Sequence, residues 1–266
     1  MRKGYVDGST GQVHYRWVGE DGPVVVLLHQ TASSSRMYER FMAAMPSGYR
    51  LIALDTPGFG ASDPYAAQPS TAQLVAALAE AVAALGHDRY HLLGHHTGAA
   101  LACEWAAGHG EAVRSLAMIG GLAMGAEARA NWLAGVSDAP LSADGAHLLR
   151  AWERVAGIDA VPVASPPDVD LRHREAVDVL IASPRWPEAY RAVFSQDFEA
   201  HLERVGCPAL LMSGTEDILW PYFEATAASK PDMRTDVLPG GAYALDQHTE
   251  AVVTIYLDFL TGLRTA

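Results

Sequence analysis

The sequence predicts an α/β fold, in which a mostly parallel central sheet is flanked by helices and interrupted by a helical insertion. Apolar strand-like runs alternate with helical segments between residues 13 and 119. Helical patterns then replace the strand pattern over residues 122–196, and strands return from Cys207 onwards. Alternation of this kind is typical of a parallel sheet with right-handed crossover connections.

The strands are expected to differ in burial. Residues 13–18 alternate between polar and apolar side chains, as an edge strand does, whereas residues 23–28 form the continuous apolar run of a central parallel strand. Further strands are expected at 50–54, 90–94, 113–119, 207–212 and 233–238. Helices are expected against the sheet at 36–45, 70–85, 98–108 and 249–260, and in the insertion at 126–134, 142–156, 169–181 and 187–198.

The length and composition favour one domain with an insertion. The chain has 266 residues, of which 50% are hydrophobic, and this is enough for one sizeable α/β core. We expect residues 1–121 and 197–266 to form the core, and residues 122–196 to form a helical cap, or lid. Either a monomer or a homodimer is compatible with this organisation.

The charge argues against several classes of partner. The formal net charge is −12, and neither Lys nor Arg clusters in the sequence, whereas nucleic acids and anionic membranes select clustered cations. No apolar run approaches the roughly 18 residues that a membrane span needs, and no signal-peptide pattern follows Met1. We therefore expect a cytoplasmic protein that acts on a small molecule and binds neither nucleic acid nor membrane.

A Gly-x-x-x-Gly turn at residues 94–98 joins the strand that begins at Tyr90 to a helix of small residues. A sharp strand-to-helix turn lifts its middle side chain above the end of a parallel sheet, and the crowded backbone requires glycines on both sides. The raised residue here is His96. The backbone N–H of Thr97, at the start of the helix, is positioned to stabilise an oxyanion.

Four stretches carry recognisable motifs: residues 27–29 with the loop that follows, residues 55–62, the turn at 94–98, and residues 214–221. Together they resemble the motifs of the α/β-hydrolase-fold superfamily with a helical cap, and the resemblance spans nearly the whole chain. The resemblance implies the α/β-hydrolase fold and a hydrolase. It places the nucleophile position at His96, the triad acid at Asp217, and the oxyanion-hole donors at the backbone of Thr97 and of Gln30 or Thr31.

The sequence departs from the family pattern at two catalytic positions. Histidine stands at position 96 where serine is usual, and the loop that normally supplies the catalytic histidine has Ala242 or Tyr243 in its place. His248 is the nearest imidazole in the sequence, but it stands where the last helix should begin, so a capping or surface role is expected. Whether Tyr243 or His248 replaces the missing histidine is left open.

His96 could still support catalysis, because imidazole is a general base near neutral pH and a nucleophile toward activated carbonyls. Its ring could reach toward Asp217, and the carboxylate would then fix the tautomer of the imidazole. The first hypothesis is hydrolysis of a small apolar or aromatic ester or lactone, with His96 as base or nucleophile. The alternatives are a lyase or isomerase that uses His96 to abstract a proton, and a catalytically silent ligand-binding protein.

Five residues in the loops above the sheet or in the insertion are candidates for substrate contact. For each of them, the alternative is a purely structural role. They are His29, Tyr38, Trp132, Trp220 and Tyr243. No cofactor motif occurs, since no lysine follows the turn at 94–98, and the histidines lack metal-ligand spacing. We therefore expect neither a cofactor nor a metal ion.

Overall fold

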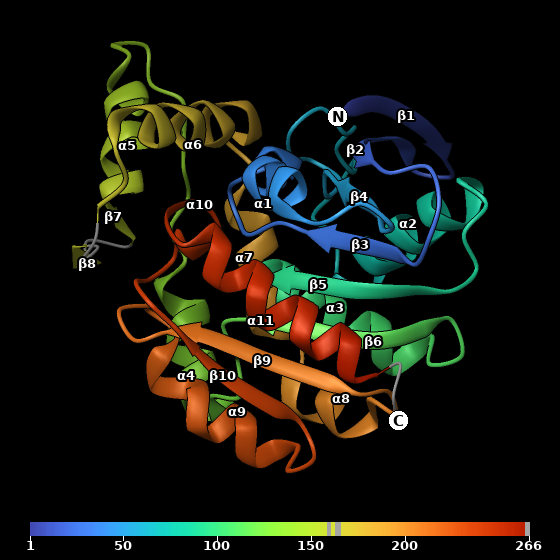
Figure 1. The fold of residues 1–266 in the computed structure, drawn as a ribbon. Coiled ribbons are helices and arrows are strands. Elements are labelled where there is room, and N and C mark those ends of the chain that lie inside the picture. The colour runs from blue at the N-terminus through green and yellow to red at the C-terminus, as the bar shows by residue number, and fades with distance from the viewer. Residues whose placement is uncertain (159–160, 163–165, 264–266) are drawn as a thin grey trace.

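The computed structural model describes residues 1–158, 161–162 and 166–263. Its centre is an eight-stranded sheet in the order β1-β2-β4-β3-β5-β6-β9-β10 (Figure 1). The strands are β1 (Arg2–Gly8), β2 (Gly11–Val18), β3 (Val24–Leu28), β4 (Arg50–Leu54), β5 (Tyr90–His95), β6 (Val113–Ile119), β9 (Ala209–Gly214) and β10 (Arg234–Leu238).

The sheet is mostly parallel, as predicted. Strands from β4 across to β10 pair in parallel, and only β1 and β2 run antiparallel to their neighbours. The sequence did not predict β1. Its side chains are exposed or only half-buried, so the strand lacks the apolar alternation that marks a strand in sequence.

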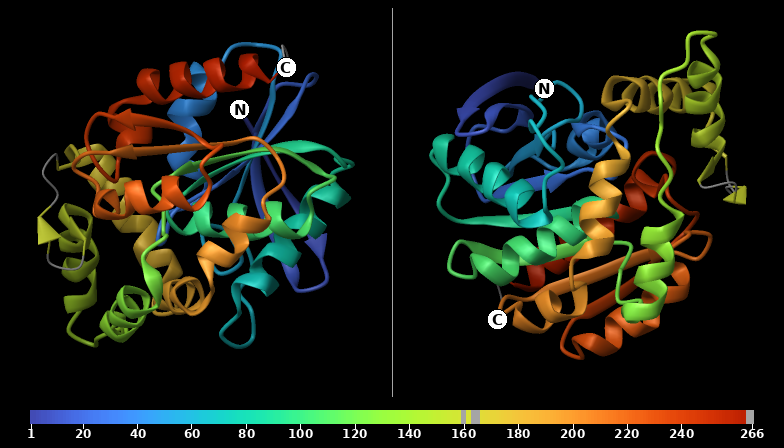
Figure 2. Two further views of the ribbon diagram at one scale, coloured as in Figure 1. Left: turned by 90° about the horizontal axis from the view of Figure 1, so that it is seen from below. Right: turned by 180° about the vertical axis from the view of Figure 1, so that it is seen from behind.

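Helices cover both faces of the sheet, and the strand side chains alternate between two cores. Val26 and Leu28 of β3 face one core, with α2 (Thr71–Ala84), α3 (Thr97–Gly108), α8 (Phe198–Arg204) and α9 (Phe223–Ser229). Val25 and Leu27 face the other core, with α1 (Glu39–Ala44), α10 (Ala244–Gln247) and α11 (Thr249–Gly262). The left view of Figure 2 shows α1 and α11 on one side of the sheet and α2, α3 and α8 on the other. The central strands are therefore buried on both faces.

The chain between β6 and β9 is largely helical, where the insertion was predicted. It contains α4 (Gly125–Gly135), α5 (Ala146–Ala156), α6 (Val169–Ala182) and α7 (Pro187–Ser195). Two details differ from the prediction. Two-residue strands β7 (Gly157–Ile158) and β8 (Val161–Pro162) pair within the insertion, and the helix predicted to reach residue 198 ends at Ser195. Asp197 then caps a separate helix, α8, by accepting a hydrogen bond from the N–H of Ala200.

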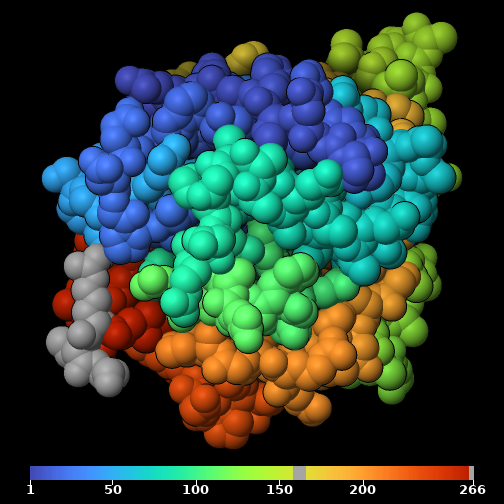
Figure 3. All heavy atoms as spheres, turned by 90° about the vertical axis from the view of Figure 1, so that its right-hand side faces the viewer, coloured from blue at the N-terminus to red at the C-terminus, as the bar shows by residue number. Residues whose placement is uncertain are grey.

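Helices α5 and α6 lie beside the main body of the molecule, as Figure 1 shows, and yellow-green atoms of the insertion project from it in the space-filling view (Figure 3). The longest helices, α2, α6 and α11, have 14 residues each. Over the described part of the chain, no helix combines the length and apolar character needed to cross a membrane.

Candidate active site

The turn between β5 and α3 has the strained backbone of a nucleophile elbow. His96 has φ 48° and ψ −110°, and it is the one non-glycine residue with positive φ in the described part of the chain. A Cβ atom on Gly94 would lie 2.1 Å from the carbonyl oxygen of Gly98, and one on Gly98 would lie 2.0 Å from that of Leu28. Both glycines are therefore required for this turn.

The imidazole of His96 reaches the carboxylate of Asp217, which lies in the loop after β9. Its Nε2 atom is 3.0 Å from Oδ1 and 2.9 Å from Oδ2 of Asp217. The exposed fraction of the side chain is 11% for His96 and 0% for Asp217. The N–H of Leu219 also donates to Oδ1, at 2.8 Å. The structure therefore joins the two residues that the sequence placed 121 positions apart.

Gly120 makes this contact possible, although no motif in the sequence marks it as a site residue. Strand β6 lies between β5 and β9, so the ring of His96 must cross the end of β6 to reach Asp217. A Cβ atom built on Gly120 would lie 2.6 Å from Cδ2 and 3.2 Å from Nε2 of His96. The signal in the sequence is the Gly120-Gly121 pair that ends this strand, but only the fold shows what it accommodates.

The pair has a defined protonation pattern. Burial alone would raise the pKa of Asp217, but the adjacent His96 imidazole holds that pKa below its usual range, so the carboxylate is ionised at neutral pH. An ionised carboxylate accepts the proton on Nε2, which leaves the lone pair on Nδ1 of His96. Within the described residues, no recorded hydrogen bond uses Nδ1. In a neutral imidazole with its proton on Nε2, Nδ1 is the atom that can accept a further hydrogen bond.

His95 lies behind this pair and is completely buried. Its ring contacts that of His96 edge to face, with 4.4 Å between centroids, and neither ring nitrogen has a hydrogen-bond partner among the described residues. Burial, and then the neighbouring His96, lower the pKa of His95 well below its usual range, so its imidazole is neutral at neutral pH.

His95, His96 and Asp217 offer three possible metal-ligand atoms that lie within 4.8 Å of one another. Spacing in the sequence did not predict this group, because the fold brings Asp217 to the elbow. Two ligands of a tetrahedral zinc ion, each about 2.0–2.2 Å from the metal, lie only about 3.3 Å apart. Since Asp217 already accepts hydrogen bonds from His96 and Leu219, the geometry fits a hydrogen-bonded pair better than a metal centre.

The predicted oxyanion donors separate into two groups. Thr97 is the first residue of α3, and the first-turn N–H groups of a helix have no partner within the helix. Thr31 is nearly buried in the loop after β3. The N–H of Gln30, by contrast, donates to the sulfur of Met37 at 3.4 Å. Thr97 and Thr31 therefore remain the candidates, and Gln30 is the weaker choice.

Helices of the insertion hold the loop that contains Thr31. The hydroxyl of Ser33 donates to Glu175 at 3.1 Å, and that of Ser34 donates to Asp178 at 2.8 Å. Both carboxyls are buried, and burial raises the pKa of each. From the next helix, α7, the hydroxyl of Tyr190 donates to the carbonyl oxygen of Thr31 at 3.1 Å. Sequence reasoning missed these contacts because they join segments more than 140 residues apart.

His29 and Tyr38, two predicted substrate contacts, have structural positions instead. Nδ1 of His29 donates to the carbonyl oxygen of Gln30 at 2.8 Å, and its Nε2 accepts from the N–H of Thr56 at 2.9 Å. Tyr38 is fully buried and donates to the carbonyl oxygen of Leu28 at 2.8 Å. Neither side chain has a polar atom left for a substrate.

Tyr243, at the position of the missing histidine, also turns away from the elbow. Its hydroxyl donates to the carbonyl oxygen of Val155 in α5 at 3.0 Å, and burial raises its pKa well above the usual range. His248 packs against Gly240, where a Cβ atom would lie 2.8 Å from its Nε2. No described hydrogen bond joins Tyr243 or His248 to His96. It follows that His96 contacts Asp217 without an intervening histidine.

Asp55 directly follows β4 and is buried. Its carboxylate contacts Nδ1 of His14 at 2.8 Å and accepts from the N–H groups of Ser35 and Ala61 at 2.6 and 2.9 Å. Burial alone would raise its pKa, but the hydrogen bond with His14 and its other partners lower it to about 2. Asp55 therefore organises the loops beneath the site.

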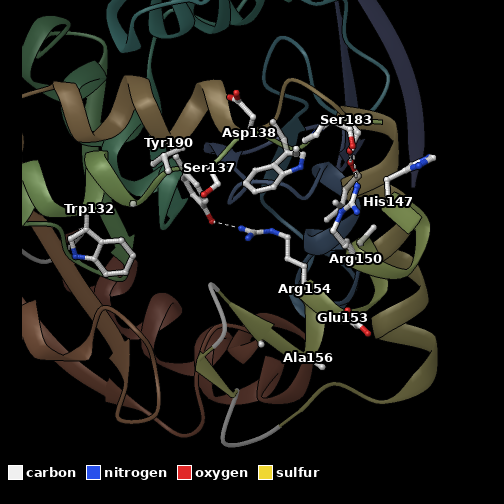
Figure 4. Close-up of a pocket in the computed structure, with 18 of the residues that line it drawn as sticks. Trp132, Ser137, Asp138, His147, Arg150, Glu153, Arg154, Ala156, Ser183 and Tyr190 are labelled. Atoms are coloured by element: carbon white, nitrogen blue, oxygen red, sulfur yellow. Dashed lines mark hydrogen bonds between the residues drawn. The ribbon is translucent and has the colours of Figure 1, made fainter. Parts of the chain in front are cut away.

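A cavity of about 1080 Å³ opens among the helices of the insertion (Figure 4). Trp132 is one of its lining residues, whereas Trp220 stacks on Phe223 at 4.9 Å and is not. The elbow residues do not line the cavity either. Two hydrogen bonds connect its wall to the segments that follow β3 and β9: the one from Tyr190 to Thr31, and one from the indole of Trp132 to the hydroxyl of Tyr222 at 2.9 Å.

Comparison with known proteins identifies relatives over most of the chain. A family model described as the alpha/beta hydrolase fold matches residues 23–154. The 2-hydroxy-6-oxononadienedioate/2-hydroxy-6-oxononatrienedioate hydrolase 2 of Pseudomonas putida is 29% identical over 282 residues, covering 94% of this chain and 91% of its own length. A fluoroacetate dehalogenase of a Burkholderia species is 26% identical over 275 residues, covering 93% and 90%.

The overall structure is also similar to known structures. The enol-lactonase from Burkholderia xenovorans LB400 superposes with a TM-score of 0.76 over 97% of this chain and 100% of that chain. Its sequence is 21% identical, so this likeness concerns the fold alone. It confirms the predicted fold class, with a mostly parallel sheet flanked by helices.

Proposed function

The chain belongs to the α/β-hydrolase superfamily, and from this premise we propose that it hydrolyses a small apolar or aromatic carbonyl compound, of the ester or lactone type, without a cofactor. Hydrolysis is supported by relatives that include a named hydrolase. The observation that carries the proposal is the contact between His96 and Asp217 at the elbow, which presents Nδ1 of the imidazole as a base.

In the proposed reaction, Nδ1 of His96 removes a proton from water as the water oxygen attacks the substrate carbonyl. The carbonyl oxygen becomes an oxyanion, which the N–H groups of Thr97 and Thr31 stabilise. Asp217 stabilises the imidazolium that forms. His96 then returns the proton to the leaving alkoxide, and the products are a carboxylic acid and an alcohol, or one hydroxy acid from a lactone.

Direct attack by Nδ1 on the carbonyl is a second route within the same proposal. The C–O bond to the leaving group then breaks, the alkoxide takes up a proton and departs as the alcohol, and the acyl group remains on Nδ1. Water hydrolyses this acyl-imidazole to the carboxylic acid and free His96. The two routes share every residue and differ in whether a covalent intermediate forms. Mass spectrometry of the protein, quenched in acid during turnover, distinguishes them by the presence or absence of an acyl group on His96.

We also propose that residues 122–196 act as the cap that selects the substrate. Support comes from the cavity among the helices of this segment, and from the hydrogen bonds that Glu175, Asp178 and Tyr190 make to the loop containing Thr31. These contacts couple the position of the insertion to the position of an oxyanion donor.

The test compares hydrolysis of activated aryl esters and lactones by wild type, His96→Ala and Asp217→Asn, with His248→Ala as the matched imidazole control. Loss of a positioned general base is expected to lower kcat by about 10²–10⁴-fold, whereas His248→Ala should keep wild-type activity. In H₂¹⁸O, one labelled oxygen should enter the acid product. Wild-type rates no higher than those of free imidazole would refute the proposal, and turnover without label would indicate the lyase or isomerase alternative.

A further inference from the structure

The cavity in the insertion has a continuous aromatic wall. Trp132 stacks on Phe194 with 5.4 Å between ring centroids, Phe194 contacts Tyr190 at 5.9 Å, and Tyr190 meets Trp186 edge to face at 5.8 Å. All four residues line the cavity. Since Tyr190 also hydrogen bonds to Thr31, the wall leads from the oxyanion loop to Trp186. Such a wall suits an extended apolar or aromatic molecule.

An arginine stands beside Trp186 and Tyr190 in this wall. The guanidinium of Arg154 lies 4.1 Å from the ring centroid of Trp186 and 5.6 Å from that of Tyr190, and it donates to the Tyr190 hydroxyl at 2.9 Å. Figure 4 shows Arg154 extending from α5 toward Tyr190. Stacking on aromatic rings holds the guanidinium plane in one orientation, which favours binding of a planar carboxylate.

Two further arginines line the same cavity. Arg150 donates to the carbonyl oxygen of Pro140 at 3.1 Å. Arg172 donates to the carbonyl oxygen of Trp152 at 2.9 Å, and its guanidinium lies 4.3 Å from the centroid of the Trp152 ring. These partners orient the two guanidinium groups but are uncharged.

Among the described residues that line the cavity, arginines outnumber carboxylates, in contrast to the whole chain. The chain has 19 Lys and Arg against 31 Asp and Glu, whereas the described lining residues include Arg150, Arg154 and Arg172 against Asp138 and Glu153. Asp138 also pairs with Arg191, which does not line the cavity, at 2.5 Å. An acidic protein thus places three arginines in the cavity among the helices of its insertion.

Resting on the proposed hydrolase function, we infer that the substrate carries a carboxylate remote from its reactive carbonyl. The carboxylate binds among Arg150, Arg154 and Arg172, the apolar body lies along the aromatic wall, and the carbonyl faces His96. Guanidinium groups bind carboxylates through paired N–H donors, so the cavity selects anionic over neutral esters.

The test measures binding of aryl alkanoic acids that contain no ester, so it is independent of catalysis. Titration is followed by quenching of tryptophan fluorescence and by calorimetry, and each acid is paired with its primary amide. The acid is expected to bind wild type about 10-fold or more tightly than the amide. Arg154→Gln and Arg150→Gln should each reduce this preference, and Arg154→Lys should retain part of it. Arg114→Gln, at an exposed arginine of β6 outside the cavity, should leave the preference unchanged.

Equal affinities of wild type for acid and amide would overturn the inference, as would an equal loss of preference in Arg114→Gln. If the acid is preferred and esters are not hydrolysed, the anion site stands and the proposed hydrolysis fails. If esters are hydrolysed and the acid is not preferred, the proposed hydrolysis stands and the anion site fails. With an active enzyme, Arg154→Gln should raise KM for a carboxylated ester by a larger factor than it raises KM for the neutral counterpart.

Discussion

Replacing Gly120 by alanine should separate His96 from Asp217 without changing either residue. The added Cβ atom would lie 2.6 Å from Cδ2 of His96, whereas carbon atoms in contact prefer about 3.5–4.0 Å. The ring must therefore move by about 1 Å, which is enough to lengthen the contacts of 2.9 and 3.0 Å beyond hydrogen-bond range. Leu219, 3.1 Å from the same Cβ, limits the room for an alternative position.

Backbone strain also contributes, because Gly120 has φ +80°. A non-glycine residue at positive φ costs about 1–2 kcal/mol. Gly86 is the matched control, since its φ is +82° and a Cβ atom there would meet nothing within 4 Å. Gly86→Ala should therefore share the cost in stability and keep the position of His96.

The assay measures kcat/KM on an activated aryl ester together with the free energy of unfolding in urea. We expect kcat/KM to fall about 100-fold in Gly120→Ala and less than about 2-fold in Gly86→Ala, because only the first displaces the proposed base. Equal activities of the two variants at equal stability would refute the reasoning that the ring of His96 passes over Gly120.

Three other predictions concern the surroundings of the site. The folded-state pKa of Asp55 is about 2, below its ordinary value of 3.8. About 2 kcal/mol of stability should therefore be present above pH 4 and be lost as the pH falls toward 2. Asp55→Asn should remove this pH dependence in acid titrations of unfolding. Tyr243→Phe should lower the free energy of unfolding by about 1–3 kcal/mol, because the carbonyl of Val155 loses its donor, and should leave kcat unchanged. Ser33→Ala should lower both the stability and kcat, because the loop containing an oxyanion donor loses its bond to Glu175.

Each of these has a result that would contradict it. A wild-type stability that stays constant from pH 4 to 2 would contradict the role of Asp55. A loss of kcat in Tyr243→Phe at unchanged stability would show that the hydroxyl acts in the reaction. Unchanged kcat in Ser33→Ala would show that the oxyanion loop holds its position without the insertion.

The parts of the site that the sequence predicted are those encoded by local constraints. Gly94 and Gly98 flank a turn that any larger residue would block, so the elbow and the position of His96 could be read from five residues. Asp217 follows a buried strand in a motif of its own. The ring of His96 is longer than a serine side chain, which made its reach toward Asp217 predictable once the intermediate histidine was missing.

The parts that could not be predicted depend on contacts between distant segments. Gly120 matters only because β6 lies between β5 and β9, which is a property of strand order. Tyr243 has the size and polarity of a pocket residue, but its partner is a backbone carbonyl in the insertion. His29 was expected either to support a loop or to contact substrate, and two backbone partners occupy its nitrogens. Side-chain identity alone does not determine such pairings.

Chemical rescue of His96→Gly by free imidazole tests the central claim most directly. Glycine accepts the positive φ of this position without strain, and removal of the ring leaves space next to Asp217. We predict that imidazole restores ester hydrolysis with saturation in His96→Gly, and that the double variant with Asp217→Asn shows no saturable rescue. Rates in both variants that rise linearly with imidazole, at the slope measured without protein, would contradict a base held by Asp217 at the elbow.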